Sequence, residues 1–167
     1  MSFTPATAKP RRTARRKPDA SNAGLQLDSF LPYRLSVLSG RVSRSLSRVY
    51  ADRFGLSIPE WRIIANLGRM GPLGAGALAD RSSLDKPKLT RALQRLEARG
   101  LIKRATVAED RRRATLALTR QGGRIYRAIE PAALEWQTRL LEALSEVERA
   151  ALLEMFGRLE RQLATLD

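Results

Sequence analysis

The apolar residues of this chain follow helical spacing along most of its length and alternate only between Leu101 and Thr119. Before that stretch they recur every three or four positions, as they do on one face of a helix. Within it, segments 101–107 and 114–119 flank the charged turn 109–113 and alternate as the strands of a hairpin do. This order predicts a mainly helical fold with one small β-hairpin.

The helices before the hairpin end in a recognisable supersecondary spacing. A short helix is expected over residues 75–81, and Asp85 can cap a further helix over 86–99 that Gly100 ends. Only residues 82–84 separate these two helices. Two helices joined by so short a turn are typical of a helix-turn-helix, and the hairpin that follows would be its wing.

Amphipathic helices are also expected on both sides of this module. One covers residues 29–54, and a capping box that begins at Ser57 opens the next. After the hairpin, a long helix is expected from about residue 124, with a bend at Pro131, and a second capping box at Ser145 opens the last helix. The apolar stripes of these helices are longer than the small module can cover. We therefore expect a two-fold dimer formed by the terminal helices.

Positive charge is concentrated in the middle of the chain. The formal net charge is +14, and segment 81–127 alone carries 14 basic and 4 acidic residues. Segment 128–167, in contrast, has 4 basic and 8 acidic residues. Residues 1–24 hold 6 bases, 1 acid and almost nothing apolar, so we expect a disordered basic arm there. This distribution favours a nucleic acid as partner.

The composition excludes several classes of function. The chain has no Cys and no His, so it offers no disulfide, no thiolate or imidazole catalyst and no metal site of the usual nitrogen or sulfur type. We expect no enzyme activity, no cofactor and no metal. No run of eighteen apolar residues and no signal peptide is present, which predicts a cytoplasmic protein without a membrane partner.

The expected helix 86–99 has one face that suits DNA. Its apolar positions would face inward, and at 100° per residue its cations, including Arg99, would form a row along another face. The first turns of a recognition helix meet base edges in the major groove, where an Arg can bind a guanine through two hydrogen bonds. The candidate contacts on this helix are Lys86, Pro87, Lys88, Thr90, Arg91 and Arg95.

The run 78–104, followed by Asp110, Arg112, Leu118 and Thr119, resembles the winged helix of the MarR family of bacterial transcriptional regulators. In that family an Asp, an Arg two positions later and a Leu-Thr pair eight and nine positions after the Asp mark the wing. The resemblance covers residues 29–167. It implies a winged helix-turn-helix over about 56–122 within a single domain, 25–167, and dimerisation through helices at about 29–54 and 124–167.

The resemblance also implies roles for the wing. Arg112 would enter the minor groove and Asp110 would orient neighbouring arginines, so that Asp110, Arg111, Arg112 and Arg113 join the candidate DNA contacts. A two-fold dimer would read an inverted-repeat operator in double-stranded DNA. By the same resemblance, the homodimer would repress transcription, and a small molecule would release it. Arg34, Arg41 and Arg48 recur at seven residues and could hold an anionic effector such as an aryl acid or acyl-CoA. They could equally be solvated, pair with acids or touch DNA phosphate.

Two other functions compete with sequence-specific regulation. A sequence-tolerant architectural or nucleoid protein would use the same cations on phosphates alone. Binding of single-stranded RNA would call for exposed aromatic residues among the cations, and no aromatic residue lies within 62–125. The RNA alternative is therefore the weakest of the three.

Overall fold

The structure is a computed structural model that describes residues 24–107 and 110–166; at 105–107 and 110–114 it describes the backbone alone. The expected basic arm, 1–24, lies outside the described residues except for Gly24. The chain divides into two compact units, residues 1–37 and 38–167, and the boundary falls within the first helix. The expected domain limits stay predictions.

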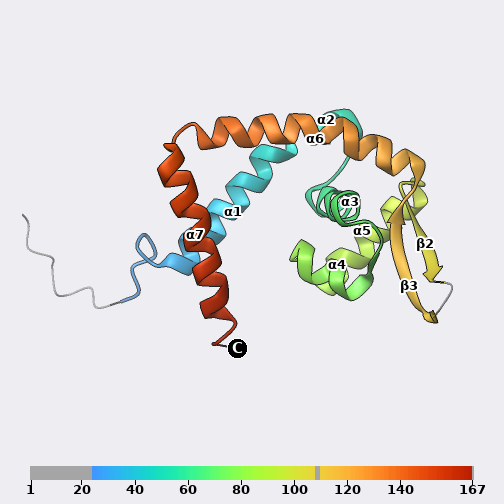
Figure 1. Cartoon of the computed structure of the whole chain (residues 1–167), viewed down its shortest axis with the longest axis horizontal. Helices are drawn as coiled ribbons and strands as arrows, with labels where there is room; N and C mark the ends of the chain where they lie inside the picture. The colour runs from blue at the N-terminus through green and yellow to red at the C-terminus, as the bar shows by residue number, and fades with distance from the viewer. Residues whose placement is uncertain (1–23, 108–109, 167) are drawn as a thin grey trace, which may run out of the picture. The chain divides into compact units, whose positions relative to one another are not determined.

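Helices account for most of the described chain, and a small sheet accompanies them (Figure 1). In chain order the elements are α1 (Leu31–Ser47), α2 (Ala51–Phe54), α3 (Ile58–Met70), β1 (Leu73–Gly74), α4 (Ala75–Ser82), α5 (Lys86–Ala98), β2 (Ile102–Val107), β3 (Asp110–Leu118), α6 (Arg120–Leu141) and α7 (Glu146–Leu163). This confirms the mainly helical fold with a hairpin. None of the described helices is long and apolar enough to cross a membrane.

Both expected capping boxes are present. The amide and the hydroxyl of Ser57 donate to one carboxylate oxygen of Glu60, at 2.7 and 2.6 Å. Ser145 binds Glu148 in the same way, at 2.8 Å from each group. These hydrogen bonds lower the pKa of Glu148, because they favour its charged form. The starts of α3 and α7 are thus fixed by local sequence.

The prediction of one continuous helix over residues 29–54 is wrong, because two helices occupy this segment. α1 ends at Ser47, and a turn over 48–50 separates it from α2. The turn places Tyr50 in the core with 1% of its surface exposed, stacked on Trp61 with ring centroids 5.2 Å apart. Burial raises the pKa of Tyr50 to about 12. Packing of one large aromatic side chain therefore interrupts the helical pattern.

A third strand, β1, pairs with the hairpin, and the sequence pattern did not predict it. The sheet is antiparallel in the order β1-β3-β2, with Leu73 opposite Leu116 and Ile102 opposite Leu118. β1 has only two residues, too few to show alternation. β3 also begins earlier than expected, at Asp110, within the segment assigned to the turn. The ladder is irregular between Thr106 and Val107.

The helix that follows the wing begins at Arg120 and not near 124. Thr119 caps it, because its hydroxyl accepts a hydrogen bond from the Gly122 amide at 3.1 Å. Gly122 and Gly123, which precede the start expected near residue 124, both lie in the first turn of α6. A Cβ on Gly122 would lie 2.0 Å from the backbone oxygen of Leu101, so glycine permits this close approach. α6 continues through Pro131, and the expected bend stays a prediction.

The core is built from α3, α4, α5, the sheet, one residue of α6, and Tyr50, Leu56 and Leu101 of the connecting segments. Its fully enclosed aliphatic side chains are Ile63, Ile64, Leu78, Leu96, Leu101 and Ile129. The half-buried side chains of Leu46, Val49 and Phe54 pack against this core from the segment before α3. The core therefore supports α5 from within and leaves its other side free.

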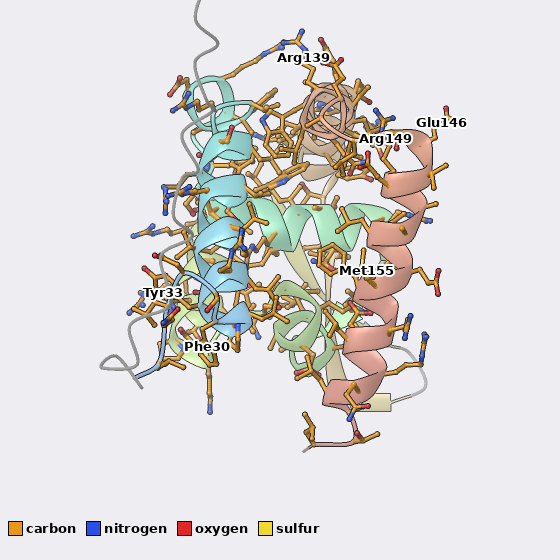
Figure 2. The ribbon with its side chains drawn as sticks, turned by 90° about the vertical axis from the view of Figure 1, so that its left-hand side faces the viewer. Phe30, Tyr33, Arg139, Glu146, Arg149 and Met155 are labelled. Atoms are coloured by element: carbon orange, nitrogen blue, oxygen red, sulfur yellow. The ribbon has the colours of Figure 1, made fainter. Side chains whose placement is uncertain are left out.

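The terminal helices contribute nothing fully buried. Neither α1 nor α7 contains a buried residue. Arg149, near the start of α7, donates from Nε to the carbonyl oxygens of Leu141 at 2.9 Å and Leu144 at 3.0 Å, and so holds the turn after α6 (Figure 2). Large apolar side chains along α7 stay exposed in the single chain, namely Val147, Leu153, Met155, Phe156, Leu159 and Leu163.

Candidate nucleic-acid interface

Helix α5 is divided cleanly between an apolar and a cationic side. Leu89, Ala92, Leu93 and Leu96 are its four buried residues, as the helical periodicity predicts. Every candidate contact on this helix is exposed, namely Lys86, Pro87, Lys88, Thr90, Arg91 and Arg95. The structure therefore places these six residues on the accessible surface of one helix.

The first turn of α5 is fixed by Asp85. Its side chain accepts from the Lys88 amide at 2.8 Å and pairs with the Lys88 ammonium at 2.7 Å. These hydrogen bonds to Lys88 lower the pKa of Asp85. Thr90 donates its hydroxyl to the Lys86 carbonyl at 2.9 Å, so this side chain can still accept a hydrogen bond or offer its methyl group. The helix end that would meet DNA is thus well formed before any partner binds.

Three of the cations share a hollow with the start of α3. Lys88, Arg91 and Arg95 line a cavity of about 260 Å³ together with Ser57, Pro59 and Ala92. The lining of this hollow is mainly apolar, so these side chains contribute their carbon chains to it, and their charged ends can stay in solvent. Lys88, Arg91 and Arg95 therefore lie close together on the exposed face of α5.

Arg99 does not extend the cationic row, contrary to the sequence-based expectation. Its guanidinium donates to the carbonyl oxygens of Gly55 at 2.9 Å and Phe54 at 2.6 Å. Helical periodicity gives the direction of a side chain's first bond but not its partner. The free carbonyls at the end of α2 attract this guanidinium.

The wing is present as a backbone hairpin next to α5. Arg104 of β2 pairs with Glu97 of α5 at 2.8 Å, which ties the base of the wing to this helix. The side chains of Asp110, Arg111, Arg112 and Arg113 lie outside the described residues. Their DNA contacts stay predictions.

The candidate effector residues are exposed. Arg34 belongs to the first unit, whereas Arg41 and Arg48 belong to the second, and each has an exposed side chain. They line none of the three cavities described for this molecule. Binding of an anion by these arginines stays a prediction.

A larger cavity lies beside Tyr126, which the sequence pattern did not single out. Leu67, Gly68, Arg120, Arg127 and Glu130 are among the residues that line its volume of about 620 Å³. The Tyr126 hydroxyl donates to Glu130 at 2.5 Å, and this bond raises the pKa of Tyr126. The Tyr126 ring stacks on Trp61, with centroids 6.4 Å apart. In the sequence, the position of Tyr126 on the inner side of an amphipathic helix was the only feature that could have pointed to this cavity.

A helix-turn-helix whose second helix exposes a cationic face, followed at once by a β-hairpin, defines a winged-helix DNA-binding protein. The model of the MarR family matches residues 54–113. The HTH-type transcriptional regulator FarR of Neisseria gonorrhoeae is 32% identical over 114 residues, which are 68% of this chain and 78% of that protein. The chain belongs to the MarR family of transcriptional regulators.

Solved structures agree with this assignment. A MarR/EmrR family regulator from Acinetobacter sp. ADP1 superposes with a TM-score of 0.77 at 26% identity, over 84% of this chain and 99% of that one. NadR, solved in complex with 4-hydroxyphenylacetate, gives a TM-score of 0.69 at 25% identity, over 86% of this chain and 97% of that one. The winged-helix fold is thereby confirmed. These relatives are transcriptional regulators and not enzymes.

Proposed function

We propose that the chain acts as a homodimeric repressor that binds an inverted-repeat operator through α5 and is released by a small anionic ligand. The observation that carries the proposal is the exposed cationic face of α5, with Lys88, Arg91 and Arg95 around one hollow. An α-helix that presents such a face can enter the major groove, and the wing beside it can reach the adjacent minor groove.

Dimerisation is supported by the apolar side chains that the single chain leaves exposed. Phe156, Leu159 and Leu163 follow helical spacing along α7, with 40%, 39% and 59% of their surfaces exposed. Leu134 and Leu140 of α6 are also exposed, at 57% and 47%. Exposed apolar rows of this length favour contact with a second copy. Two α5 helices in a two-fold dimer would read half-sites about one helical turn, roughly 34 to 36 Å, apart.

The proposed release by a ligand is based on the solved structure of a related protein. NadR was solved with 4-hydroxyphenylacetate, an aromatic carboxylate. By analogy, the effector of this chain would be a small anion, and Arg34, Arg41 and Arg48 are the proposed partners of its charge. A ligand releases DNA only if it binds one arrangement of the two α5 helices more tightly than the other.

Competition binding at fixed salt tests the proposed function. A labelled operator, selected from genomic fragments with the purified protein, is displaced by unlabelled operator or by bulk DNA. A sequence-specific repressor is expected to prefer its operator by about 10³-fold or more. A preference near unity, together with a steep salt dependence, would instead establish the sequence-tolerant architectural protein.

Base reading by Arg91 gives a more local prediction. Arg91→Ala is expected to cost about 1 to 3 kcal/mol in operator binding and to relax the preference at one base position, because the side chain that would bind a base edge is removed. Fluorescence anisotropy with operators substituted at each position measures both effects. Arg120→Ala, which removes an exposed cation outside α5, is the matched control. Equal losses on all sequences would show that Arg91 contacts phosphate only.

A further inference from the structure

Two arginines join the recognition helix to the segment that precedes the helix-turn-helix. The hydrogen bonds of Arg99 to Phe54 and Gly55 connect the end of α5 to the end of α2. Gly55 has a left-handed backbone, with φ of 59°, which ends α2. Carbonyl oxygens at a helix C-terminus have no partner within the helix, so a guanidinium bound to two of them satisfies both and opposes the negative end of the helix dipole.

Arg62 of α3 makes a connection close to the other end of α5. Its guanidinium donates to the Ser82 carbonyl and to the Ser43 hydroxyl, each at 3.1 Å. Ser82 is the last residue of α4, and Ser83, which follows it, has a left-handed backbone with φ of 51°. Arg62 therefore binds the turn that leads into α5, only three residues before the cap at Asp85. Through Ser43 it also binds α1.

We propose that Arg62 and Arg99 are positioning residues that fix the direction of α5 relative to the segment 38–55. A guanidinium is a rigid planar fork, so two hydrogen bonds from one group restrain orientation as well as distance. With one restraint near each end of α5, rotation of the helix about either point is opposed by the other. Core packing of Leu46, Val49 and Phe54 is less directional and leaves this task to the hydrogen bonds.

The consequence of this role for DNA binding rests on the proposed function. If the terminal helices hold the dimer together, the direction of α5 relative to α1 sets the separation of the two reading helices. Arg62 and Arg99 would then determine which half-site spacing the protein accepts, without touching DNA themselves. Neither residue would change the cationic face of α5.

The first test measures the restraint without DNA. The chain has no Cys, so Arg44→Cys on α1 and Gln94→Cys on α5, both at exposed positions, give two unique sites for spin labels. Labelled protein is diluted into an excess of unlabelled protein so that only distances within one chain are recorded. Arg62→Lys and Arg99→Lys, alone and combined, are expected to broaden the distance distribution, because one ammonium cannot reproduce the fork. An unchanged width in the combined variant would overturn the proposal.

The second test measures the consequence on DNA. Operators that differ by one inserted base pair between the half-sites are compared. The parent protein is expected to lose about tenfold in affinity on the insertion, and the combined Lys variant about threefold or less. Lys keeps the charge, so attraction to bulk DNA should not change. The control is Arg53→Lys, because the Arg53 guanidinium lies 5.2 Å from the centre of the Phe54 ring and takes no part in the restraint.

A third variant keeps the proposal testable if either Lys variant folds poorly. Ser43→Ala removes the hydroxyl that accepts from Arg62 and leaves all charges in place. It is expected to broaden the label distribution less than the combined variant but more than Arg53→Lys does. If no inverted repeat is preferred at all, the proposed function fails, whereas the label measurement still decides whether the two arginines restrain α5. Labels that broaden while spacing preference stays unchanged would overturn the positioning role.

Discussion

Phe156→Asp is expected to convert the dimer into single chains and to lower operator affinity by about 100-fold or more. Phe156 lies on the exposed apolar row of α7 with Leu159 and Leu163. A carboxylate placed in an apolar interface has no partner for its charge, and its desolvation costs several kcal/mol. Because α7 contains no buried residue, the single chain should still fold. Loss of one α5 helix per complex removes half of the contacts to DNA.

Sedimentation velocity and operator anisotropy measure these two effects. The matched control is Arg161→Gln, which lowers the net charge by one unit as Phe156→Asp does but lies on the opposite side of α7. The control should remain a dimer. A Phe156→Asp variant that still sediments as a dimer would show that this row of α7 is not the interface.

Gly122→Ala is expected to destabilise the protein by about 3 kcal/mol or more, at the upper end of the cost of overpacking. The added Cβ would lie 2.0 Å from the Leu101 oxygen, a distance at which the backbone must move. That oxygen also accepts the Thr119 amide at 3.0 Å, so it cannot shift without breaking a hydrogen bond beside the wing. The expected strain falls where α6 meets the start of β2.

Urea unfolding at fixed protein concentration measures this loss. Gly123→Ala is a close control, because its Cβ would meet only the far end of the flexible Arg127 side chain, at 3.4 Å. Alanine in place of glycine within a helix usually stabilises by roughly 0.5 to 1 kcal/mol. If both variants unfold at the same urea concentration, the close approach of Gly122 to Leu101 is not a constraint on the fold.

The sequence allowed most of the recognition module to be predicted, since its signals are local. The caps at Ser57 and Asp85 and the inward positions of α5 depend on residues within one or two helical turns of each other. The break of the first helix at Tyr50 and the start of α6 at Arg120 could not be predicted in this way. The break depends on Trp61, on which Tyr50 stacks. The start of α6 combines a local cap at Thr119 with the close approach of Gly122 to the distant Leu101, which helical periodicity does not show.

The candidate site shows the same difference between features set by local sequence and features set by distant partners. Exposure of Lys88, Arg91 and Arg95 follows from helical periodicity, and the structure agrees with it. The different role of Arg99 does not follow, because its partners at Phe54 and Gly55 are more than forty positions away in the chain. Arg62 carried no sequence signal at all, because an arginine within an amphipathic helix is ordinarily solvated.

The most direct test of the central claim, that α5 of each protomer enters DNA, is strand cleavage from a tethered iron chelate. Lys88→Cys at the exposed start of α5 provides a unique thiol for the chelate, since the chain has no Cys. On the selected operator, we expect two clusters of cleavage centred about one helical turn, roughly 10 to 10.5 base pairs, apart. Cleavage spread evenly along the DNA by a bound protein would contradict it.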